Sequence, residues 1–505
     1  PSAHHRVRAL AGVLPLGVIE LSHLVGSAVG VALLVLAWAI RRRLDAAYGL
    51  TIALLGVGIV ASLLKGLDWE EASALAAVLV VVAPARRAFY RRAAVTSDPP
   101  SLRWLGAVAL VVGASVWLGL FSFQHVEYAN DLWWRFSVRG DAPRFLRATV
   151  VVVVALGAVA LARLLRTAEA APALPDAAAL DRAAGVVRTV PTSAANVALL
   201  GDKALLFAAD GDGFVQYGVA GRSWVSMGDP VAATAERRAE LAWRFREEAD
   251  RAGAWPVFYQ VTPDALPLYI DLGLTFMKLG EEAHVPLARF AVPGGGSKWM
   301  KRALKEGEKH GMTFEVVPPA HVAPLLPALR AVSDDWLGGK ATREKGFSLG
   351  RFEEAFVARF PVALVRHQGR IVAFANLWLG APGTELAPDL MRHLRDAARG
   401  TMDFLFVRLL HWGHDEGWTR CNLGMAPLSG LEARQLAPLW ARAGAIVAAR
   451  GERFYNFRGL RAFKEKFDPE WEPRYLASPG GIALPRILAN VATLISGGLT
   501  GVVKR

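Results

Sequence analysis

The sequence predicts an N-terminal bundle of transmembrane α-helices followed by α/β domains in tandem. Three observations support this class. The chain of 505 residues is 53% hydrophobic and has a mean hydropathy of +0.29, which is too apolar for an ordinary soluble protein. Long apolar runs recur from Val13 to about Leu165. After about residue 180, short apolar runs alternate with helical patterns, as they do in α/β proteins.

Five apolar runs in the first third are candidate membrane spans, because a span needs about 20 apolar residues. They cover residues 13–40, 48–64, 72–83, 105–121 and 148–165. The third run is short and could be re-entrant, and the first is long enough to form two pieces. Arginines follow runs one, three and five, whereas acidic residues follow runs two and four. The positive-inside rule therefore places everything after Arg166 in the cytoplasm.

The composition of the sequence changes after Arg166. Residues 167–180 (TAEAAPALPDAAAL) are rich in Ala and Pro and are typical of a linker. The start, PSAHHRVR, lacks Met and enters an apolar run almost at once, so we expect a piece of a longer membrane protein. The predicted organisation is transmembrane helices over 1–166, a linker over 167–180, α/β domains over 181–297 and 298–480, and a tail over 481–505.

Charge and cysteine content limit the partners and the compartment. The formal charge of +13 and the isoelectric point near 10.1 indicate lipid headgroups, nucleic acid or both as partners. The single cysteine, Cys421, excludes a disulfide within the chain, and we interpret it as a small buried residue rather than a nucleophile. His411 and His414 share a helical face without a third ligand, so no metal site is predicted.

The α/β part contains the same order of elements twice. In the first round we expect strands at 204–208, 213–219 and 223–227, a helix over 233–252, a strand at 255–261, a short helix over 264–272, and strands at 274–279 and 284–287. In the second round we expect helix 298–311, strand 313–317, helices 321–337 and 352–360, strands 362–367, 370–379 and 387–393, helix 401–416 and strand 419–423. This order predicts two α/β units in tandem, although no sequence repeat is visible.

One local pattern in the second round points to an anionic donor. A strand DLMRHL is followed by the loop RDAARG and then by a long helix from Thr401. N-acetyltransferase-like (GNAT) folds receive an anionic donor in this way, with backbone N–H groups at the helix start facing phosphates. The loop contains Arg399 and Gly400 but no further glycine in the turn, which argues against ordinary binding of CoA.

Five segments of this part resemble motifs of the bacterial phosphatidylglycerol aminoacyltransferases, the lysyl- or alanyl-phosphatidylglycerol synthases also called multiple peptide resistance factors. The segments are EKGFSLGRF (344–352), DLMRH (389–393), MDFLF (402–406), NLGMAPLSGL (422–431) and FYNFRGLRAFKEKFDPEWEPRYLA (454–477). The match covers about residues 180–476, and the apolar runs resemble the last part of the family's membrane domain. The resemblance implies two tandem GNAT-like (acyl-CoA N-acyltransferase-like) domains, with the active site in the second.

The resemblance also implies a reaction. An aminoacyl group, with lysyl favoured, passes from an aminoacyl-tRNA to a glycerol hydroxyl of phosphatidylglycerol in the inner leaflet of the bacterial cell membrane. The product lipid is less anionic or cationic and gives resistance to cationic antimicrobial peptides. Aminoacyl-tRNA is a co-substrate, and no cofactor or metal is expected. Alanyl transfer, a membrane-anchored module that lost catalysis and a peptidoglycan-type transferase are the alternatives. The oligomeric state, including a homo-oligomer, stays open.

This ester exchange requires a base for the lipid hydroxyl, a donor for the oxyanion, and cations for the lipid phosphate and the tRNA end. Asp389 and Arg392 meet the first two needs, because they lie three residues apart at the end of a predicted strand. We predict that Asp389 is the base or binds the α-ammonium group of the amino acid, and that Arg392 holds a phosphate or the oxyanion. The alternative interpretation is a local ion pair at the surface.

The predicted substrate-binding residues lie mostly in the last motif and just before it. They are Asn422, Glu452, Tyr455, Arg458, Arg461, Lys464 and Lys466. Arg461 and Lys464 are three residues apart and share a helical face, which suits phosphate or tRNA, although a solvated basic face is the alternative. Glu452 is a candidate for binding an amino group. Tyr455, with Phe457 and Phe463, could stack on the terminal adenine, or these aromatic residues could be core.

Two further segments have expected roles at the substrates. The basic helix 298–310 carries Lys298, Lys301, Arg302, Lys305 and Lys309. It could contact the acceptor stem of the tRNA or the anionic membrane, or it could be a solvated face. Asn422 begins a segment that follows a strand and is expected to shape the floor of the pocket.

Overall fold

The computed structural model describes residues 43–64, 68–91, 172–290, 298–338, 344, 346–431 and 457–496, with scattered residues between 29 and 41. The chain divides into two compact units. One contains residues 1–170 with 251–253, and the other contains residues 171–250 and 254–505. Each unit is described by itself.

The described helices of the first unit are α3 (Asp45–Leu64), α4 (Trp69–Val82) and the 3-10 turn η1 (Ala83–Ala88). Among the described residues, α3 is the one helix long and apolar enough to cross a membrane. Helix α4 has 14 residues and would extend about 21 Å, which is short of the roughly 30 Å hydrocarbon core. The runs 105–121 and 148–165 lie outside the described residues, so the five-span bundle stays a prediction.

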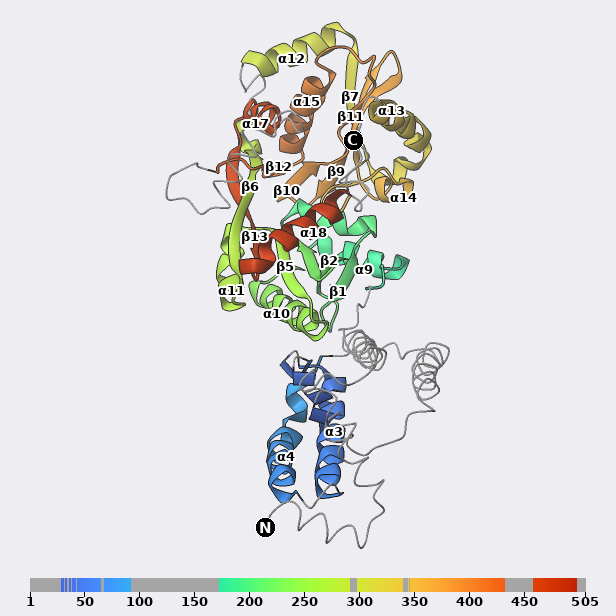
Figure 1. Ribbon diagram of the computed structural model, residues 1–505. Coiled ribbons are helices and arrows are strands. Elements are labelled where there is room, and N and C mark those ends of the chain that lie inside the picture. Colours follow the sequence, from blue (N-terminus) through green and yellow to red (C-terminus); the bar gives the residue numbers. More distant parts are fainter. Residues whose placement is uncertain are drawn as a thin grey trace, which may run out of the picture. The chain divides into compact units, whose positions relative to one another are not determined.

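The described part of the second unit is built on one sheet of 13 strands (Figure 1). The strands are β1 (Ala204–Phe207), β2 (Gly213–Ala220), β3 (Ser223–Met227), β4 (Val231–Ala232), β5 (Trp255–Val261), β6 (Thr275–Pro286), β7 (Met312–Val317), β8 (Val362–His367), β9 (Arg370–Leu379), β10 (Glu385–Pro388), β11 (Arg392–His393), β12 (Arg420–Pro427) and β13 (Glu470–Ser478). Their main order is β1-β2-β3-β5-β13-β6-β12-β10-β9-β8-β7, with β4 on β2 and β11 on β9.

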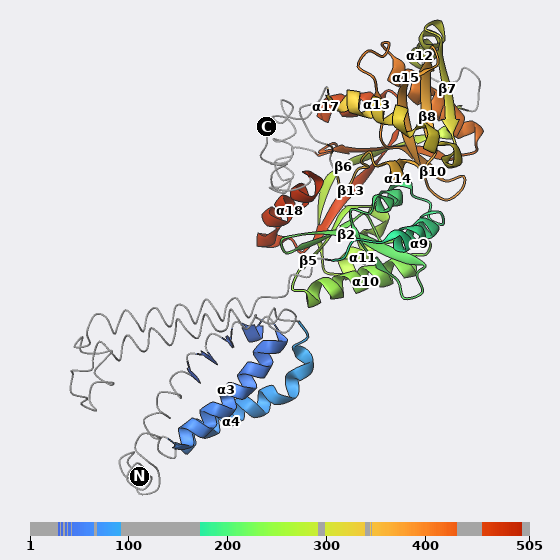
Figure 2. The same ribbon diagram turned by 90° about the vertical axis from the view of Figure 1, so that its right-hand side faces the viewer.

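Helices connect these strands and cover the sheet (Figure 2). They are α9 (Ala177–Val187), α10 (Ala235–Arg251), α11 (Leu266–Asp271), α12 (Lys298–Lys309), α13 (Leu326–Gly338), α14 (Glu354–Val357), α15 (Thr401–Asp415), α17 (Phe457–Glu465) and α18 (Leu484–Ser496), together with the 3-10 segment η2 (Ser193–Leu200). Helix α9 begins within the predicted linker, where the side chain of Asp176 accepts the N–H of Ala179 at 2.8 Å. Helix α18 lies in the predicted tail and buries Ile487 and Val491.

The unit contains the same arrangement twice, in a first half from α9 to β6 and a second half from α12 to β13. In the first half β3 pairs with β5 in parallel, and α10 connects them. In the second half β10 pairs with β12 in parallel, and α15 connects them. This is the repeated α/β order that the sequence predicts.

The last strand of each half is exchanged with the other half. Strand β13 of the second half lies between β5 and β6, and β6 of the first half lies between β13 and β12. The predicted strands 274–279 and 284–287 are therefore one continuous strand, β6, because it has a hydrogen-bonded neighbour on both sides. The exchange joins both halves into one sheet.

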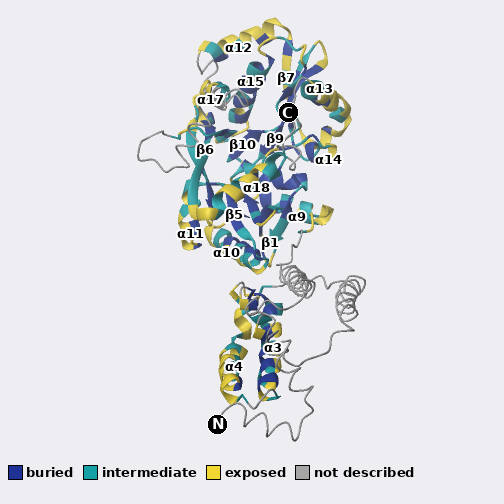
Figure 3. Ribbon diagram, in the orientation of Figure 1, coloured by how far each residue is buried: buried dark blue, intermediate teal, exposed yellow. Residues whose placement is uncertain are grey.

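The core lies on the sheet strands and on the inner faces of the helices, while exposed residues follow the outer helix faces (Figure 3). Helix α15 buries most of its length, including Phe404, Leu405 and Leu409. Cys421 on β12 is fully buried, and burial raises the pKa of its thiol far above the usual range. The interpretation of Cys421 as a buried strand residue is confirmed.

Candidate active site

Asp389 lies directly after β10, where the chain leaves the sheet. The predicted strand 387–393 breaks here into β10 and β11, because the Asn376 side chain accepts the next backbone N–H, that of Leu390, at 2.8 Å. One carboxylate oxygen, Oδ1, accepts the backbone N–H of Gly350 at 3.2 Å. The other oxygen, Oδ2, is buried and has no hydrogen-bond partner among the described residues. A buried, half-satisfied carboxylate is costly to fold and is therefore a candidate for function.

The surroundings of Asp389 raise the pKa of its carboxyl group toward neutral pH. Burial raises the pKa of Asp389 to about 7, against the hydrogen bond from Gly350, the neighbouring amide of Asn376 and the charge of Arg392, which lower it, while the charge of Glu344 raises it. A β-carbon on Gly350 would lie 1.8 Å from Oδ2, so only glycine allows this approach of the backbone. A general base works best with a pKa near the operating pH.

Arg392 is buried, with 3% of its surface exposed. Its guanidinium donates to the hydroxyl of Ser333 and to the carboxylate of Glu344. It also lies over the rings of Trp336, at 5.3 Å, and Phe352, at 6.0 Å. The interpretation of the predicted catalytic pair as an ion pair at the surface is wrong, because this arginine is buried and its ion pair is with Glu344. Glu344 was missed as a site residue, although it begins the EKGFSLGRF motif.

The two parallel strands of the second half separate beside this carboxylate. They pair over only two positions, beginning with Glu385 opposite Arg420, whereas the parallel strands of the first half pair over five positions. Beyond the pairing, β12 is irregular between Asn422 and Met425. The side chain of Asn422 is buried and accepts the N–H of Gly424 at 2.7 Å, which holds this irregular segment in shape.

The first half provides an internal comparison. Asp229 follows β3 as Asp389 follows β10, and burial raises the pKa of Asp229 too. Its carboxylate is fully satisfied, however, by the hydroxyl of Tyr269 at 2.6 Å and by the hydroxyl and N–H of Thr262 at 2.8 and 3.1 Å. Asp229, which follows the corresponding strand, is therefore satisfied by the first half itself, whereas one oxygen of Asp389 has no partner among the described residues.

Lys464 on α17 is 5% exposed and does not lie on a solvated face. Its ammonium donates to the carbonyls of Gly424 and Met425 at 2.8 and 2.9 Å. Burial lowers the pKa of Lys464 to about 8, and the charge of Glu282 opposes this shift. Lys464 thus stabilises the irregular part of β12 through its two backbone carbonyls. These contacts do not support the prediction that Lys464 binds phosphate or tRNA.

Arg461 on α17 and Lys466, just after this helix, are also engaged with the protein. Arg461 forms an ion pair with Glu281 at 2.8 Å and lies over the ring of Trp471 at 4.4 Å. Lys466 is 3.4 Å from the carboxylate of Asp403. These contacts place both residues at the surface of the second half, partly exposed, and leave a role in substrate binding as a prediction.

The aromatic residues of the same helix belong to the core where they are described. Phe463 packs on Phe406 at 5.3 Å and on Phe467 at 5.4 Å, and Phe467 is 1% exposed. The alternative that these aromatics are core is therefore confirmed for Phe463. Three predicted residues stay predictions because they, or their side chains, lie outside the described residues: Glu452, Tyr455 and Arg458.

A buried network of charges occupies the exchanged strands. Arg474 donates to Glu282 at 2.8 Å and to Glu472 at 2.6 Å. His284 lies 3.3 Å from Glu282 and 3.4 Å from Glu385. Burial alone would lower the pKa of His284, but its contacts with Glu282 and Glu385 raise it to about 9, so the ring is a cation at neutral pH. The network joins β6, β10 and β13.

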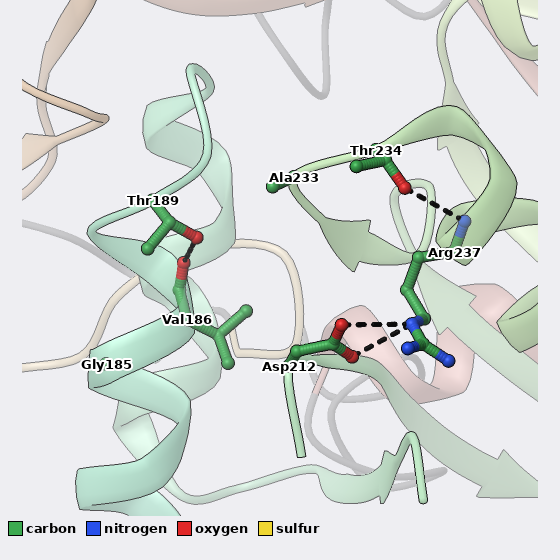
Figure 4. Close-up of a pocket in the computed structure, with 7 residues that line it drawn as sticks. All are labelled: Gly185, Val186, Thr189, Asp212, Ala233, Thr234 and Arg237. Carbon is green, nitrogen blue, oxygen red and sulfur yellow. Dashed lines mark hydrogen bonds and ion pairs between the residues drawn. The ribbon is translucent and has the colours of Figure 1, made fainter. Parts of the chain in front are cut away.

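A pocket of about 350 Å³ lies elsewhere, in the first half between α9 and the start of α10 (Figure 4). Its lining residues are Gly185, Val186, Thr189, Asp212, Ala233, Thr234 and Arg237. Arg237 is held by Asp212, at 2.9 Å, and by further acidic residues. None of the predicted site residues lines this pocket. Among the described residues, no group of three or more His, Cys, Asp and Glu side chains could hold a metal ion.

The fold and the candidate site define a class of protein. It is a tandem α/β unit with exchanged strands, in which an aspartate with one unpartnered oxygen among the described residues follows β10 of the second half. The chain belongs to the phosphatidylglycerol lysyltransferase family, because the model of "Phosphatidylglycerol lysyltransferase, C-terminal" matches residues 185–478. The predicted resemblance is confirmed.

Individual relatives agree with this assignment. Phosphatidylglycerol lysyltransferase of Bacillus subtilis (strain 168) is 32% identical over 455 residues, which is 88% of this chain and 52% of the relative. The enzyme of Staphylococcus xylosus is 33% identical over 277 residues, which is 55% of this chain and 33% of the relative. The chain thus spans about half the length, or less, of the curated relatives it matches.

Two solved structures share the fold. The C-terminal domain of a putative lysylphosphatidylglycerol synthetase from Agrobacterium fabrum has 43% identity and a TM-score of 0.58, and the match covers 64% of this chain and 98% of that one. The structure of L-PGS from Bacillus licheniformis has 35% identity and a TM-score of 0.57, and the match covers 65% of this chain and 98% of that one. Both matches correspond in extent to the α/β unit.

Proposed function

We propose that the chain transfers an aminoacyl group, lysyl in preference to alanyl, from aminoacyl-tRNA to a glycerol hydroxyl of phosphatidylglycerol. The observation that carries this proposal is the half-buried side chain of Asp389, directly after β10 where β10 and β12 stop pairing. Its buried oxygen, Oδ2, has no hydrogen-bond partner among the described residues. The names of the relatives support the reaction, since those that it matches are called phosphatidylglycerol lysyltransferases.

In the proposed reaction Asp389 acts as general base. Its Oδ2 takes the proton of the lipid hydroxyl while that oxygen attacks the ester carbonyl of the aminoacyl group. The tetrahedral intermediate collapses, the bond to the ribose oxygen of the tRNA breaks, and the proton on Asp389 passes to that oxygen. The new ester joins the amino acid to the lipid, and the tRNA leaves with a free hydroxyl.

The positive charge of Arg392, held in a fixed position, assists the same proton transfer. It lowers the pKa of Asp389, so it favours the carboxylate that the reaction needs. A buried guanidinium held by Glu344 cannot reorient toward solvent, and it stabilises negative charge that develops nearby. We propose that Arg392 contributes to the oxyanion in this way, and that its contacts with protein make it a poor ligand for the lipid phosphate.

We further propose that both halves are GNAT-like and that the α/β unit works on the cytoplasmic face of the bacterial inner membrane. The parallel strand pair with a helix between its strands, present in each half, supports the first point. The apolar helix α3 and the apolar runs of the first unit support a multi-pass anchor. The product would reduce the negative charge of the membrane and give resistance to cationic peptides.

Transfer can be tested directly with the purified full chain. Radiolabelled Lys-tRNA and phosphatidylglycerol vesicles should yield a labelled lipid that partitions into chloroform, and treatment of the tRNA with ribonuclease beforehand should abolish it. A faster reaction with Ala-tRNA would replace the lysyl assignment by the alanyl one. The absence of labelled lipid with both tRNAs would exclude the enzyme and leave a non-catalytic module.

The outer face of α12 is suited to the RNA substrate. Its five cations, Lys298, Lys301, Arg302, Lys305 and Lys309, are all exposed and fall within an arc of about 100° on the helix. The opposite face is buried on α15, where a β-carbon on Gly307 would lie 2.2 Å from Phe404. Because its apolar face is covered, α12 cannot insert into a lipid layer, and it presents a row of charge about 16 Å long. We propose that this row binds tRNA phosphates.

Neutralising three cations of this row tests the assignment. We expect the variant Lys301→Ala/Arg302→Ala/Lys305→Ala to raise the KM for Lys-tRNA about tenfold at physiological salt, with kcat nearly unchanged, and to reduce the salt dependence of binding by about two phosphate contacts. The matched control is Arg330→Ala/Arg366→Ala/Arg370→Ala, because these arginines of the same half are held in ion pairs. Equal effects in both variants, or weaker vesicle binding with an unchanged KM for tRNA, would contradict the proposal.

A further inference from the structure

The segment from Glu344 to Phe352, called the active-site loop below, determines the environment of Asp389. Its Gly350 N–H binds Asp389 Oδ1 at 3.2 Å. Its Glu344 binds Arg392 and also accepts the N–H of Phe352 at 3.2 Å. Both predicted catalytic residues are therefore held by this loop, and a small displacement of the loop would change both contacts.

The middle of the loop is anchored in the first half of the unit rather than in the second. The ring of Phe347 is buried in the core of the first half, 6.4 Å from the ring of Tyr259 on β5. Its backbone N–H donates to Asp202 Oδ2 at 3.3 Å. Phe347 has φ = 63°, a left-handed conformation that a phenylalanine holds only when its surroundings impose it. The contacts from the first half impose this turn.

Asp202 is itself held by its neighbour Lys203, the most deeply buried lysine among the described residues. The side chain of Lys203 is 0% exposed, and its ammonium lies 2.5 Å from Asp202 Oδ1. The same ammonium lies 5.7 Å from the centre of the Phe347 ring. The fold of the first half does not by itself explain this buried lysine, because burying an ion pair in a core gains little stability. Its ion-pair partner Asp202 binds the turn of the active-site loop, and the ring of Phe347 belongs to that turn.

We propose that Asp202 and Lys203 form a positioning pair, by which the first half sets the active-site loop and thereby the orientation of the Asp389 carboxylate. This inference rests on the proposed transferase function, and it explains how the non-catalytic half takes part in the reaction. Asp202 fixes the backbone of Phe347, three residues before Gly350. Lys203 pairs with the other carboxylate oxygen of Asp202 and so holds the side chain toward that backbone. Neither residue touches a substrate in this scheme.

The charges around Asp389 give the expected direction of a pH effect. The groups that act on it are Arg392 on β11, Glu344 and Gly350 of the loop, Asn376 on β9 and Lys203 of the first half. Losing Asp202 releases the turn at Phe347 and Gly350, while Glu344 stays held by its ion pair with Arg392. The N–H of Gly350 favours the carboxylate, so its loss raises the pKa of Asp389.

Variants at Asp202 separate positioning from folding. In full-length protein we expect Asp202→Ala to lower kcat about tenfold with the KM values for Lys-tRNA and phosphatidylglycerol changed by less than about twofold. The pH below which kcat/KM falls, the acid limb of its pH profile, should rise by about half a pH unit or more. Asp202→Asn keeps an acceptor for Phe347 and should retain most of kcat. The pair variant Asp202→Ala/Lys203→Met also removes the acceptor, leaves no unpaired buried charge and should behave like Asp202→Ala.

Tyr269→Phe is the matched control, because it removes a buried hydrogen bond, to Asp229, from the same half without touching the loop. The Tyr269→Phe variant should be less stable than the wild type. Its kcat, and the pH below which its kcat/KM falls, should be unchanged. The positioning role is overturned if Asp202→Ala lowers kcat no more than Tyr269→Phe does and leaves the acid limb in place.

A second measurement needs no activity. The difference in stability between chains with Asp389 and with Asp389→Asn, followed against pH by hydrogen exchange, reports the pKa of Asp389 by linkage. If the wild-type chain made no lipid product, the proposed function would fail. The pKa of Asp389 would still decide the positioning role, which requires a higher value in Asp202→Ala than in the wild type.

Discussion

Replacing Asp389 with asparagine should abolish most of the transfer, with a fall in kcat of about 10²- to 10⁴-fold. Asparagine keeps the shape of the side chain and an acceptor for the Gly350 N–H, but it cannot take a proton from the lipid hydroxyl. The measurement is labelled lipid formed per minute by the full chain with Lys-tRNA and phosphatidylglycerol. A variant that keeps the full rate would exclude Asp389 as base while leaving the family assignment unchanged.

The pH dependence of the wild-type enzyme should follow the same group. Because burial raises the pKa of Asp389 to about 7, the carboxylate form is present above that pH, and kcat/KM should fall as the pH drops below 7. The stability effect has the opposite sign. An acid whose pKa is raised on folding destabilises the folded state once the pH exceeds its unfolded value, so the fold loses stability between about pH 4 and 7. Asp389→Asn should therefore gain about 1–2 kcal/mol at pH 8.

Asp229 provides the matched control for this prediction, since it occupies the corresponding place in the first half. Its carboxylate is satisfied by Tyr269 and Thr262, so Asp229→Asn breaks hydrogen bonds and should cost roughly 1–3 kcal/mol. It should leave transfer nearly intact. Asp389→Asn should lose transfer activity and gain stability, whereas Asp229→Asn should lose stability and keep activity. This difference would distinguish a catalytic carboxylate from a structural one.

The sequence predicts local features of this protein better than its distant pairings. The order of strands and helices follows from hydrophobic periodicity, and Asp389 and Arg392 were predicted as site residues because they lie together in one motif. Lys464 was predicted as a ligand for phosphate or tRNA, and nothing local in the sequence shows that the carbonyls of Gly424 and Met425 lie within its reach. The burial of a charged side chain depends on which strand packs behind it.

The largest omissions come from the exchange of strands. Glu344 and Arg392 are 48 positions apart, and Glu282 and Arg474 are 192 apart. No period or spacing relates residues at such separations. The Glu282–Arg474 contact depends on the register of β6 with β13, whereas the Glu344–Arg392 contact joins an irregular segment to β11. One signal was present in the sequence, namely charged residues inside otherwise apolar strands. Charges at such positions are seldom buried unless they are paired.

The second large effect is expected at this network, where Arg474→Met should destabilise the α/β unit by about 3–5 kcal/mol. Arg474 is the partner of Glu282, and both side chains are 8% exposed. Removing the arginine leaves the Glu282 carboxylate in the protein interior with His284 as its remaining partner in the network. Hydrogen exchange of the β6 and β13 amides in the full chain measures the loss, since these strands join the two halves.

Arg237→Met is the control that shows whether the loss of stability follows the burial of an ion pair or the number of ion pairs. Arg237 pairs with three carboxylates, Asp210, Asp212 and Glu240, each more than half exposed. Exposed pairs contribute little, so this variant should cost less than about 1 kcal/mol although it breaks more ion pairs. Adding Glu282→Gln to Arg474→Met removes the stranded charge and should recover part of the loss. If Arg474→Met cost no more than Arg237→Met, the buried network would not be what holds the exchanged strands together.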